Sequence, residues 1–69
     1  MSKEISTIAK NIKKYRAKIG ISQDKLSKLA GMTLHTITKI ESGATFDPRI
    51  ETVKKIADAL GVDIDDLMK

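Results

Sequence analysis

The sequence contains no cysteine, no tryptophan, one proline and one histidine. Without cysteine the chain can form neither a disulfide nor a thiolate metal site, and a reducing compartment is its natural setting. A single histidine cannot build a metal cluster, and no apolar run is long enough for a signal peptide or a membrane-spanning helix. We therefore expect a cytoplasmic protein with no membrane segment, no metal and no cofactor.

The chain also lacks the residues of a catalytic site. It offers no plausible set of serine, histidine and acid and no glycine-rich phosphate loop, and the lone histidine stands without an adjacent acid. The cluster of Asp63, Asp65 and Asp66 resembles a metal site only superficially. Asp63 is placed to cap a helix, and the other two suit the positive first turn that follows. The sequence predicts that the protein is not an enzyme.

Charge is unevenly distributed along the 69 residues. Residues 1–40 carry nine Lys or Arg and two acids, whereas residues 41–69 carry four Lys or Arg and seven acids. A chain of 69 residues has room for one domain, so we expect residues 1–69 to form a single domain. The uneven charge suits a domain that turns one face to a polyanion, although lysines that merely solubilise helix surfaces would give the same count of charges.

Apolar periodicity and glycines mark the helices. Apolar residues recur in steps of three and four from Ile5 to Ile19, which predicts a helix of about 15 residues. Further apolar-periodic runs cover residues 23–30, 34–42 and 50–60. Each of the first four runs is followed by a glycine, where a left-handed residue ends a helix. These glycines are Gly20, Gly31, Gly43 and Gly61.

Helix starts agree with these stops. Ser22, Thr33 and Asp63 can each cap the run that follows, and each is flanked by an apolar pair at the spacing of a hydrophobic staple. Asp47 and Pro48 form a turn or the entry to the fourth helix. No run alternates like a strand. The predicted fold is all-α, with five short, compactly packed helices. The staple pairs are Ile21 with Leu26, Met32 with Ile37, and Val62 with Leu67.

The second and third helices are joined by only Gly31, Met32 and Thr33. So tight a joint forces a steep crossing, which is typical of a helix-turn-helix motif, here about residues 22–43. At 100° per residue, Ile37 and Ile40 lie on one side of the third helix, and a mixed polar and apolar face covers about 140° of the other. Major-groove readout needs such a mixture, but an ordinary solvent face would also look like this. The mixed face comprises Leu34, His35, Thr38, Lys39 and Ser42.

Residues 9–69 resemble the Cro/CI-type (XRE-like, lambda-repressor-like) helix-turn-helix family. The resemblance is carried by "SQDKLSKLAG" with Gly31 at the turn, by Thr33 and Ile37, by "KIESG", and by "ETVKKIADALGVDIDDLM". It implies a lambda-repressor-like domain that binds double-stranded DNA as a transcriptional regulator. It further implies a repressor that acts as a homodimer on a two-fold operator. An antitoxin or a protein-interaction adaptor on the same fold, with a toxin or effector domain as partner, is the alternative.

The resemblance also implies roles for individual residues. It places Gln23 at a phosphate, where the free N–H groups at the start of a helix face the anion. A residue that merely opens the helix is the alternative for Gln23. The resemblance further implies an ion pair of Arg16 with Glu41 that holds the third helix at its angle. The implied base-reading residues are Leu34, His35, Thr38 and Lys39, and the implied phosphate-binding residues are Gln23, Thr33, Ser42 and Thr45.

The sequence departs from the family pattern at two places. After Gly43 it reads "ATFDPR", and Asp47 in this loop puts phosphate contacts there in doubt. Phe46 is expected either in the core or at a dimer interface. Leu34 stands where a polar residue is usual, so it is expected to contact either a thymine methyl or a protein partner.

Overall fold

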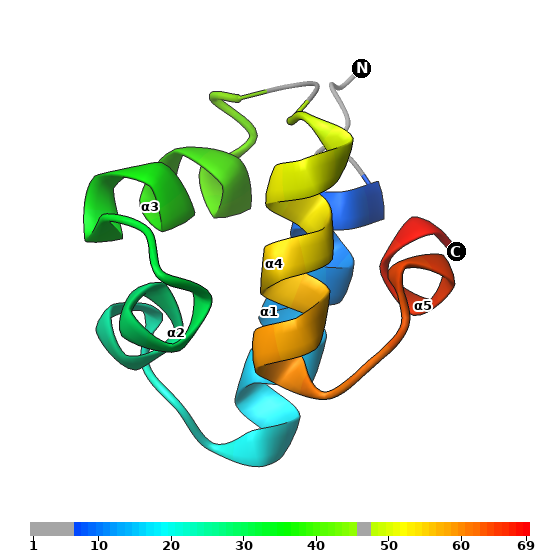
Figure 1. The fold of residues 1–69 in the computed structure, drawn as a ribbon, viewed down its shortest axis with the longest axis horizontal. Helices are drawn as coiled ribbons and strands as arrows, with labels where there is room; N and C mark the ends of the chain where they lie inside the picture. Colours follow the sequence, from blue (N-terminus) through cyan, green and yellow to red (C-terminus); the bar gives the residue numbers. More distant parts are fainter. Residues whose placement is uncertain (1–6, 46–47) are drawn as a thin grey trace.

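The computed structural model describes residues 7–45 and 48–69, and this part of the chain forms five helices (Figure 1). The all-α fold expected from the sequence is therefore confirmed. Ile5, Phe46 and Asp47 lie outside the described residues, so the expectations for them stand as stated. The helices are α1 (Thr7–Ile19), α2 (Gln23–Ala30), α3 (Leu34–Ser42), α4 (Ile50–Leu60) and α5 (Ile64–Met68).

Local capping explains where α2, α3 and α5 begin. The Ser22 hydroxyl accepts a hydrogen bond from the backbone N–H of Lys25 at 3.0 Å, and Thr33 does the same for Thr36 at 3.2 Å. Asp63 occupies the N-cap of α5, and its backbone N–H donates to the Asp66 carboxylate at 3.1 Å. These bonds satisfy N–H groups that have no partner inside their helix.

The helices surround one core of apolar side chains. In Figure 1, α1 and α4 cross at the centre, α2 and α3 lie on one side of them, and α5 lies on the other. Between them the two central helices contact all three others. The six residues of the expected staples all belong to the core or pack against it. The buried core residues are Ile12, Leu26, Ala30, Ile37, Ile40, Val53, Ile56, Ala57, Leu60 and Leu67.

Side-chain hydrogen bonds join α5 to α1 and pair a buried hydroxyl within α2. The Asn11 amide donates from α1 to the backbone oxygen of Leu67 in α5 at 2.8 Å. The buried Ser27 hydroxyl donates to the backbone oxygen of Asp24 at 2.6 Å, so its burial leaves no unpaired donor. No helix in the described ranges has the length and apolar character needed to span a membrane.

Gly31 sets the turn between α2 and α3. Its φ is 69°, a left-handed conformation, and its backbone N–H donates to the Lys28 oxygen at 3.2 Å. The next N–H, from Met32, reaches back to the Ser27 oxygen at 2.9 Å and closes the helix end. These two bonds turn the chain sharply, which allows α3 to start after only three residues.

We expect Gly31→Ala to lower the free energy of unfolding by about 1–2 kcal/mol through backbone strain at positive φ. An added Cβ would meet nothing within 4 Å, so no steric clash contributes. Gly31→Asn is the matched control, because asparagine tolerates the left-handed region better and should lose less stability. Urea denaturation followed by circular dichroism measures both variants. Equal losses in the two would contradict conformational strain as the cause.

Candidate nucleic-acid interface

The outer face of α3 presents a mixed set of exposed side chains. Ile37 and Ile40 are 0% and 2% exposed and anchor the helix to the core. The opposite side of the helix is open to solvent, and the aliphatic side chain of Leu34 remains 43% exposed there. The structure thus brings together, on one face, the four residues expected to read bases: Leu34, His35, Thr38 and Lys39.

Thr33 and Ser42, expected to contact phosphates, lie at the two ends of α3, where their hydroxyls already cap the helix. Thr33 Oγ1 accepts from the Thr36 N–H and lies 2.9 Å from Thr36 Oγ1. Ser42 Oγ donates to the Lys39 oxygen at 3.1 Å and accepts from the Ala44 N–H at 3.3 Å. A hydroxyl has one proton, so Ser42 must give up its bond to Lys39 before it can donate to a phosphate.

Thr45 lies just beyond α3, half-buried. Its backbone N–H donates to the Lys39 oxygen at 3.0 Å, which folds the chain after Gly43 back onto the end of the helix. This bond places Thr45 beside the exposed end of α3.

A bidentate ion pair joins α1 to the end of α3. Arg16 Nε donates to Glu41 Oε2 at 2.8 Å, and Arg16 Nη2 donates to Glu41 Oε1 at 3.0 Å. The Glu41 side chain is 1% exposed and that of Arg16 is 21% exposed. Arg16 Nη1 also donates to the Ile21 oxygen at 3.0 Å, so one guanidinium holds the α1–α2 connection and α3 together. Planar fork geometry of this kind is specific to arginine.

The Gln23 side chain extends the same network to the start of α2. Its Nε2 donates to Glu41 Oε1 at 3.1 Å, and its Oε1 accepts from the Thr38 hydroxyl at 3.3 Å. Both partners belong to α3. The Gln23 amide therefore lies between the buried carboxylate and the exposed face of α3. Sequence spacing gave no sign of these two contacts, because the partners lie 18 and 15 residues away along the chain.

The N-terminus of α2 retains free backbone donors next to this amide. Across residues 7–45 and 48–69, neither the Gln23 N–H nor the Asp24 N–H has a hydrogen-bond partner. Free N–H groups at the positive end of a helix dipole form a ready site for an anionic oxygen. Asp24, the one carboxylate in this turn, is paired with Lys28 at 3.3 Å. Its pairing reduces the negative charge that an approaching phosphate meets.

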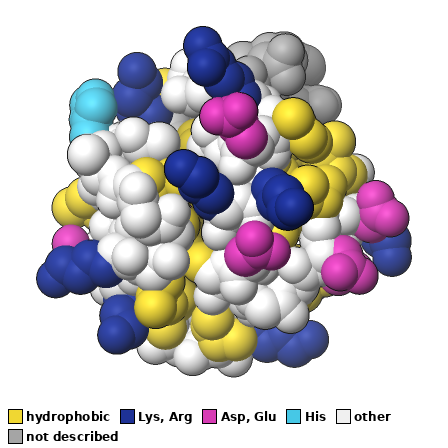
Figure 2. Space-filling model, viewed as in Figure 1, with side chains coloured by type: hydrophobic (Ala, Val, Ile, Leu, Met, Phe, Trp, Pro, Cys, Tyr) yellow, Lys and Arg dark blue, Asp and Glu magenta, His cyan; other side chains and the backbone are white. Residues whose placement is uncertain are grey.

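The balance of basic and acidic side chains differs between the helices. The first helix carries four lysines and one arginine and no acid, and the only acid in α3 is the buried Glu41. In Figure 2 the cyan imidazole lies at the edge of the view over α3, and most magenta acidic side chains lie over α4 and α5. The surface near α3 is therefore the less acidic part of the described structure, as a site for a polyanion requires.

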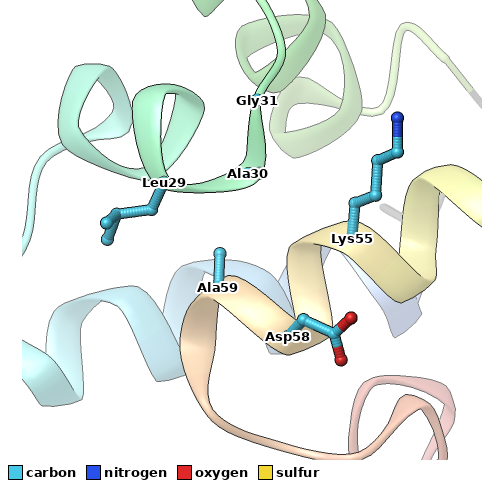
Figure 3. A pocket seen from close by; sticks show the side chains of 6 residues that line it. All are labelled: Leu29, Ala30, Gly31, Lys55, Asp58 and Ala59. Carbon is cyan, nitrogen blue, oxygen red and sulfur yellow. The ribbon is translucent and has the colours of Figure 1, made fainter.

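An open groove lies between α2 and α4, and no residue of α3 lines it (Figure 3). In Figure 3 the Ala59 methyl points toward α2, and the Lys55 and Asp58 side chains point in different directions from α4. The polar groups of the lining are one ammonium and one carboxylate, both from α4. The lining residues are Leu29, Ala30, Gly31, Lys55, Asp58 and Ala59.

Comparison with known proteins agrees with this geometry. The helix-turn-helix family model matches residues 12–67, so the chain belongs to the helix-turn-helix family, in the Cro/CI-type (XRE-like) class that its motifs resemble. An uncharacterized HTH-type transcriptional regulator of Methanocaldococcus jannaschii is 39% identical over 56 residues, which are 81% of this chain and 83% of that protein. An uncharacterized HTH-type transcriptional regulator of Archaeoglobus fulgidus is 36% identical over 56 residues, 81% of this chain and 79% of that protein.

Solved structures of an enzyme contain the same helical fold as part of a longer chain. Hydroxypropylphosphonic acid epoxidase from S. wedmorenis superposes with a TM-score of 0.82 at 25% identity. The match covers 94% of this chain but 34% of the epoxidase chain. This chain therefore spans about a third of that enzyme, and the likeness concerns the helical fold.

Proposed function

We propose that the protein is a sequence-specific double-stranded DNA-binding transcriptional regulator that reads the major groove with α3. The observation that carries the proposal is the exposed, mixed face of α3, which a buried ion pair and an apolar underside hold at a fixed angle to the N-terminus of α2. Phosphate contacts from that terminus fix the docking, and side chains of α3 select bases. The helix-turn-helix relatives support this assignment.

Three side chains have chemistry suited to base edges. The Lys39 ammonium can donate to guanine O6 and N7, the His35 imidazole can exchange hydrogen bonds with polar base atoms, and the Leu34 side chain can contact a thymine methyl. Thr38 completes the same face. The phosphate contacts come from Gln23 with the free N–H groups of α2, and from Thr33, Ser42 and Thr45 at the ends of α3.

We propose that two copies act together on a two-fold operator. A single domain of this size contacts too few bases to be very selective, and family geometry places half-sites about 34–36 Å apart. Helix α5 carries two aspartates and no basic residue, and α4 carries two acids and two lysines, so this side suits DNA less well than the side that presents α3. Each of the two helices also carries an exposed apolar side chain, Ile50 at 62% and Met68 at 51%. These helices are the proposed dimer side. A bound dimer excludes other proteins from the operator, so we infer that the protein acts as a repressor. We further propose that it acts in the cytoplasm.

Selection of DNA from a random pool tests the proposal. The parent should enrich one consensus with two-fold symmetry, and binding should weaken steeply as salt rises. His35→Ala and Lys39→Ala should each relax the consensus at one position, with a loss of about 1–3 kcal/mol of discrimination there. Lys10→Ala, an exposed lysine on α1, is the control that should retain the consensus. If both α3 variants return the parent consensus with parent affinity, the reading face is wrongly assigned.

A protein-interaction module, such as an antitoxin, is the second candidate. The exposed Leu34 favours it, because an aliphatic side chain on the reading face suits a protein partner as well as a thymine. A partner retained at high salt, together with no enriched DNA sequence, would favour this function over regulation. The epoxidase comparison does not lead us to propose catalysis, because the shared part is a third of that enzyme.

A further inference from the structure

We propose that Thr38 is a positioning residue that acts through Gln23, and that its hydroxyl does not read a base. Together with Glu41 it holds the Gln23 amide in the orientation that offers an N–H to a phosphate. This inference rests on the proposed DNA-binding function. It assigns the start of α2 and the reading face of α3 to one hydrogen-bonded unit.

The Gln23 side-chain amide can face Glu41 in only one of its two orientations. Glu41 Oε1 can only accept hydrogen bonds, and it lies 3.1 Å from Gln23 Nε2. With the amide turned over, the Gln23 oxygen would face a buried carboxylate oxygen, and two acceptors would repel each other. Arg16 holds that carboxylate in place through both of its oxygens. The network thus fixes the amide with its nitrogen toward Glu41.

The oxygen of the Gln23 amide faces Thr38. The Thr38 hydroxyl donates to Gln23 Oε1 at 3.3 Å. A hydroxyl has a single proton, so this bond leaves Thr38 without a donor for guanine or thymine oxygens. The same bond restricts rotation of the Gln23 side chain in the free protein. The entropy cost of ordering this side chain therefore does not fall on DNA binding.

The Gln23 side chain keeps one donor for a ligand. An amide nitrogen carries two protons, and Glu41 takes one of them. The second proton of Gln23 and the free N–H groups of Gln23 and Asp24 belong to the same first turn of α2. Three donors at one helix start suit one phosphate group. Thr38 therefore favours phosphate binding by keeping Gln23 in the bound rotamer before DNA arrives.

Two substitutions at one position separate this role from base reading. Thr38→Val keeps the shape and removes the hydroxyl, whereas Thr38→Ser keeps the hydroxyl and removes the methyl group. If Thr38 positions Gln23, Thr38→Val should weaken operator binding by roughly two- to tenfold, the range of one hydrogen bond, and Thr38→Ser should retain most of the affinity. A thymine-methyl contact would give the reverse order and would overturn the inference.

A double-mutant cycle with Gln23→Ala shows whether the two residues act together. Thr38→Val should weaken binding in the parent and have little further effect in the Gln23→Ala background. The DNA consensus selected by Thr38→Val should match that of the parent, because no base contact is lost. An equal effect of Thr38→Val in both backgrounds, or a changed consensus at one position, would overturn the inference while the proposed function stands.

The free protein supplies a readout that needs no DNA. The side-chain amide protons of Gln23 should shift in a ¹⁵N-resolved NMR spectrum of Thr38→Val and stay near their parent positions in Thr38→Ser. Unchanged Gln23 resonances in Thr38→Val would overturn the inference on its own. A parent protein that enriches no DNA sequence at all would instead overturn the proposed function, and this inference with it.

Discussion

Replacing Arg16 with methionine should lower the free energy of unfolding by about 3–5 kcal/mol. The Glu41 carboxylate is 1% exposed, and the substitution leaves it with the Gln23 amide as its one side-chain donor among the described residues. A buried charge without its partner is far more costly than a missing surface pair, because water cannot replace the lost contact. Urea denaturation followed by circular dichroism at 222 nm measures the change. A loss that large removes a substantial part of the stability of a small domain.

The exposed ion pair of α2 provides the matched control. Lys28 Nζ lies 3.3 Å from Asp24, and the two side chains are 73% and 57% exposed. Lys28→Met removes the same kind of charge from a solvated site, so the stability should change by no more than about 0.5 kcal/mol. If Arg16→Met loses as little as Lys28→Met, then water reaches Glu41 in solution and the pair does not hold α3.

A double substitution distinguishes a buried charge from simple loss of packing. Arg16→Met combined with Glu41→Leu removes both charges and leaves apolar side chains of similar length. Replacing a buried pair in this way is often neutral for stability, so the double variant should recover most of the loss seen in Arg16→Met. It should still bind DNA less well than the parent, because the Gln23 amide no longer has Glu41 to orient it. Recovery of both stability and affinity would show that the pair has no part in positioning α2.

Helix boundaries were predictable because they depend on nearby residues. The bounds expected for residues 23–30, 34–42 and 50–60 agree with the structure to the residue. A capping hydroxyl three residues from its N–H partner, or a glycine directly after a helix, leaves a trace in a short window of sequence. Gly31 is the clearest example, because its left-handed φ of 69° both ends α2 and sets the turn.

The polar network of the site was only partly predictable. Periodicity places Thr38 on the outer face of α3, but it does not indicate that the hydroxyl turns toward Gln23. Contacts between residues 15 to 25 positions apart depend on how the helices pack, which no local pattern encodes. The pairing of Arg16 with Glu41 was expected from the family resemblance and not from spacing. The sequence therefore predicted one of these contacts, the Arg16–Glu41 ion pair, and neither of the hydrogen bonds that the Gln23 side chain makes.

Replacing Ile37 with alanine should lower the free energy of unfolding by about 2–5 kcal/mol, because its side chain is fully buried and its loss leaves a cavity. Leu34→Ala is the matched control on the same helix. The Leu34 side chain is 43% exposed. The free energy of unfolding should therefore change by only about 0.5 kcal/mol in Leu34→Ala. Thermal denaturation of the two variants measures the difference. Similar losses in both would mean that Leu34 is packed in solution and unavailable to a ligand.

When the selected DNA sequence is measured instead of stability, Leu34→Ala should have the larger effect of the two variants. At a temperature where both are folded, Ile37→Ala should select the parent consensus, since its side chain faces the core and touches no base. Leu34→Ala should lose preference at one thymine, because the thymine methyl then has no aliphatic contact. If Leu34→Ala keeps the parent consensus and affinity but no longer binds a protein partner, Leu34 belongs to a protein-binding surface. The loss of stability thus identifies the side of α3 that packs on the core, and the change in the selected DNA sequence identifies the side that contacts the ligand.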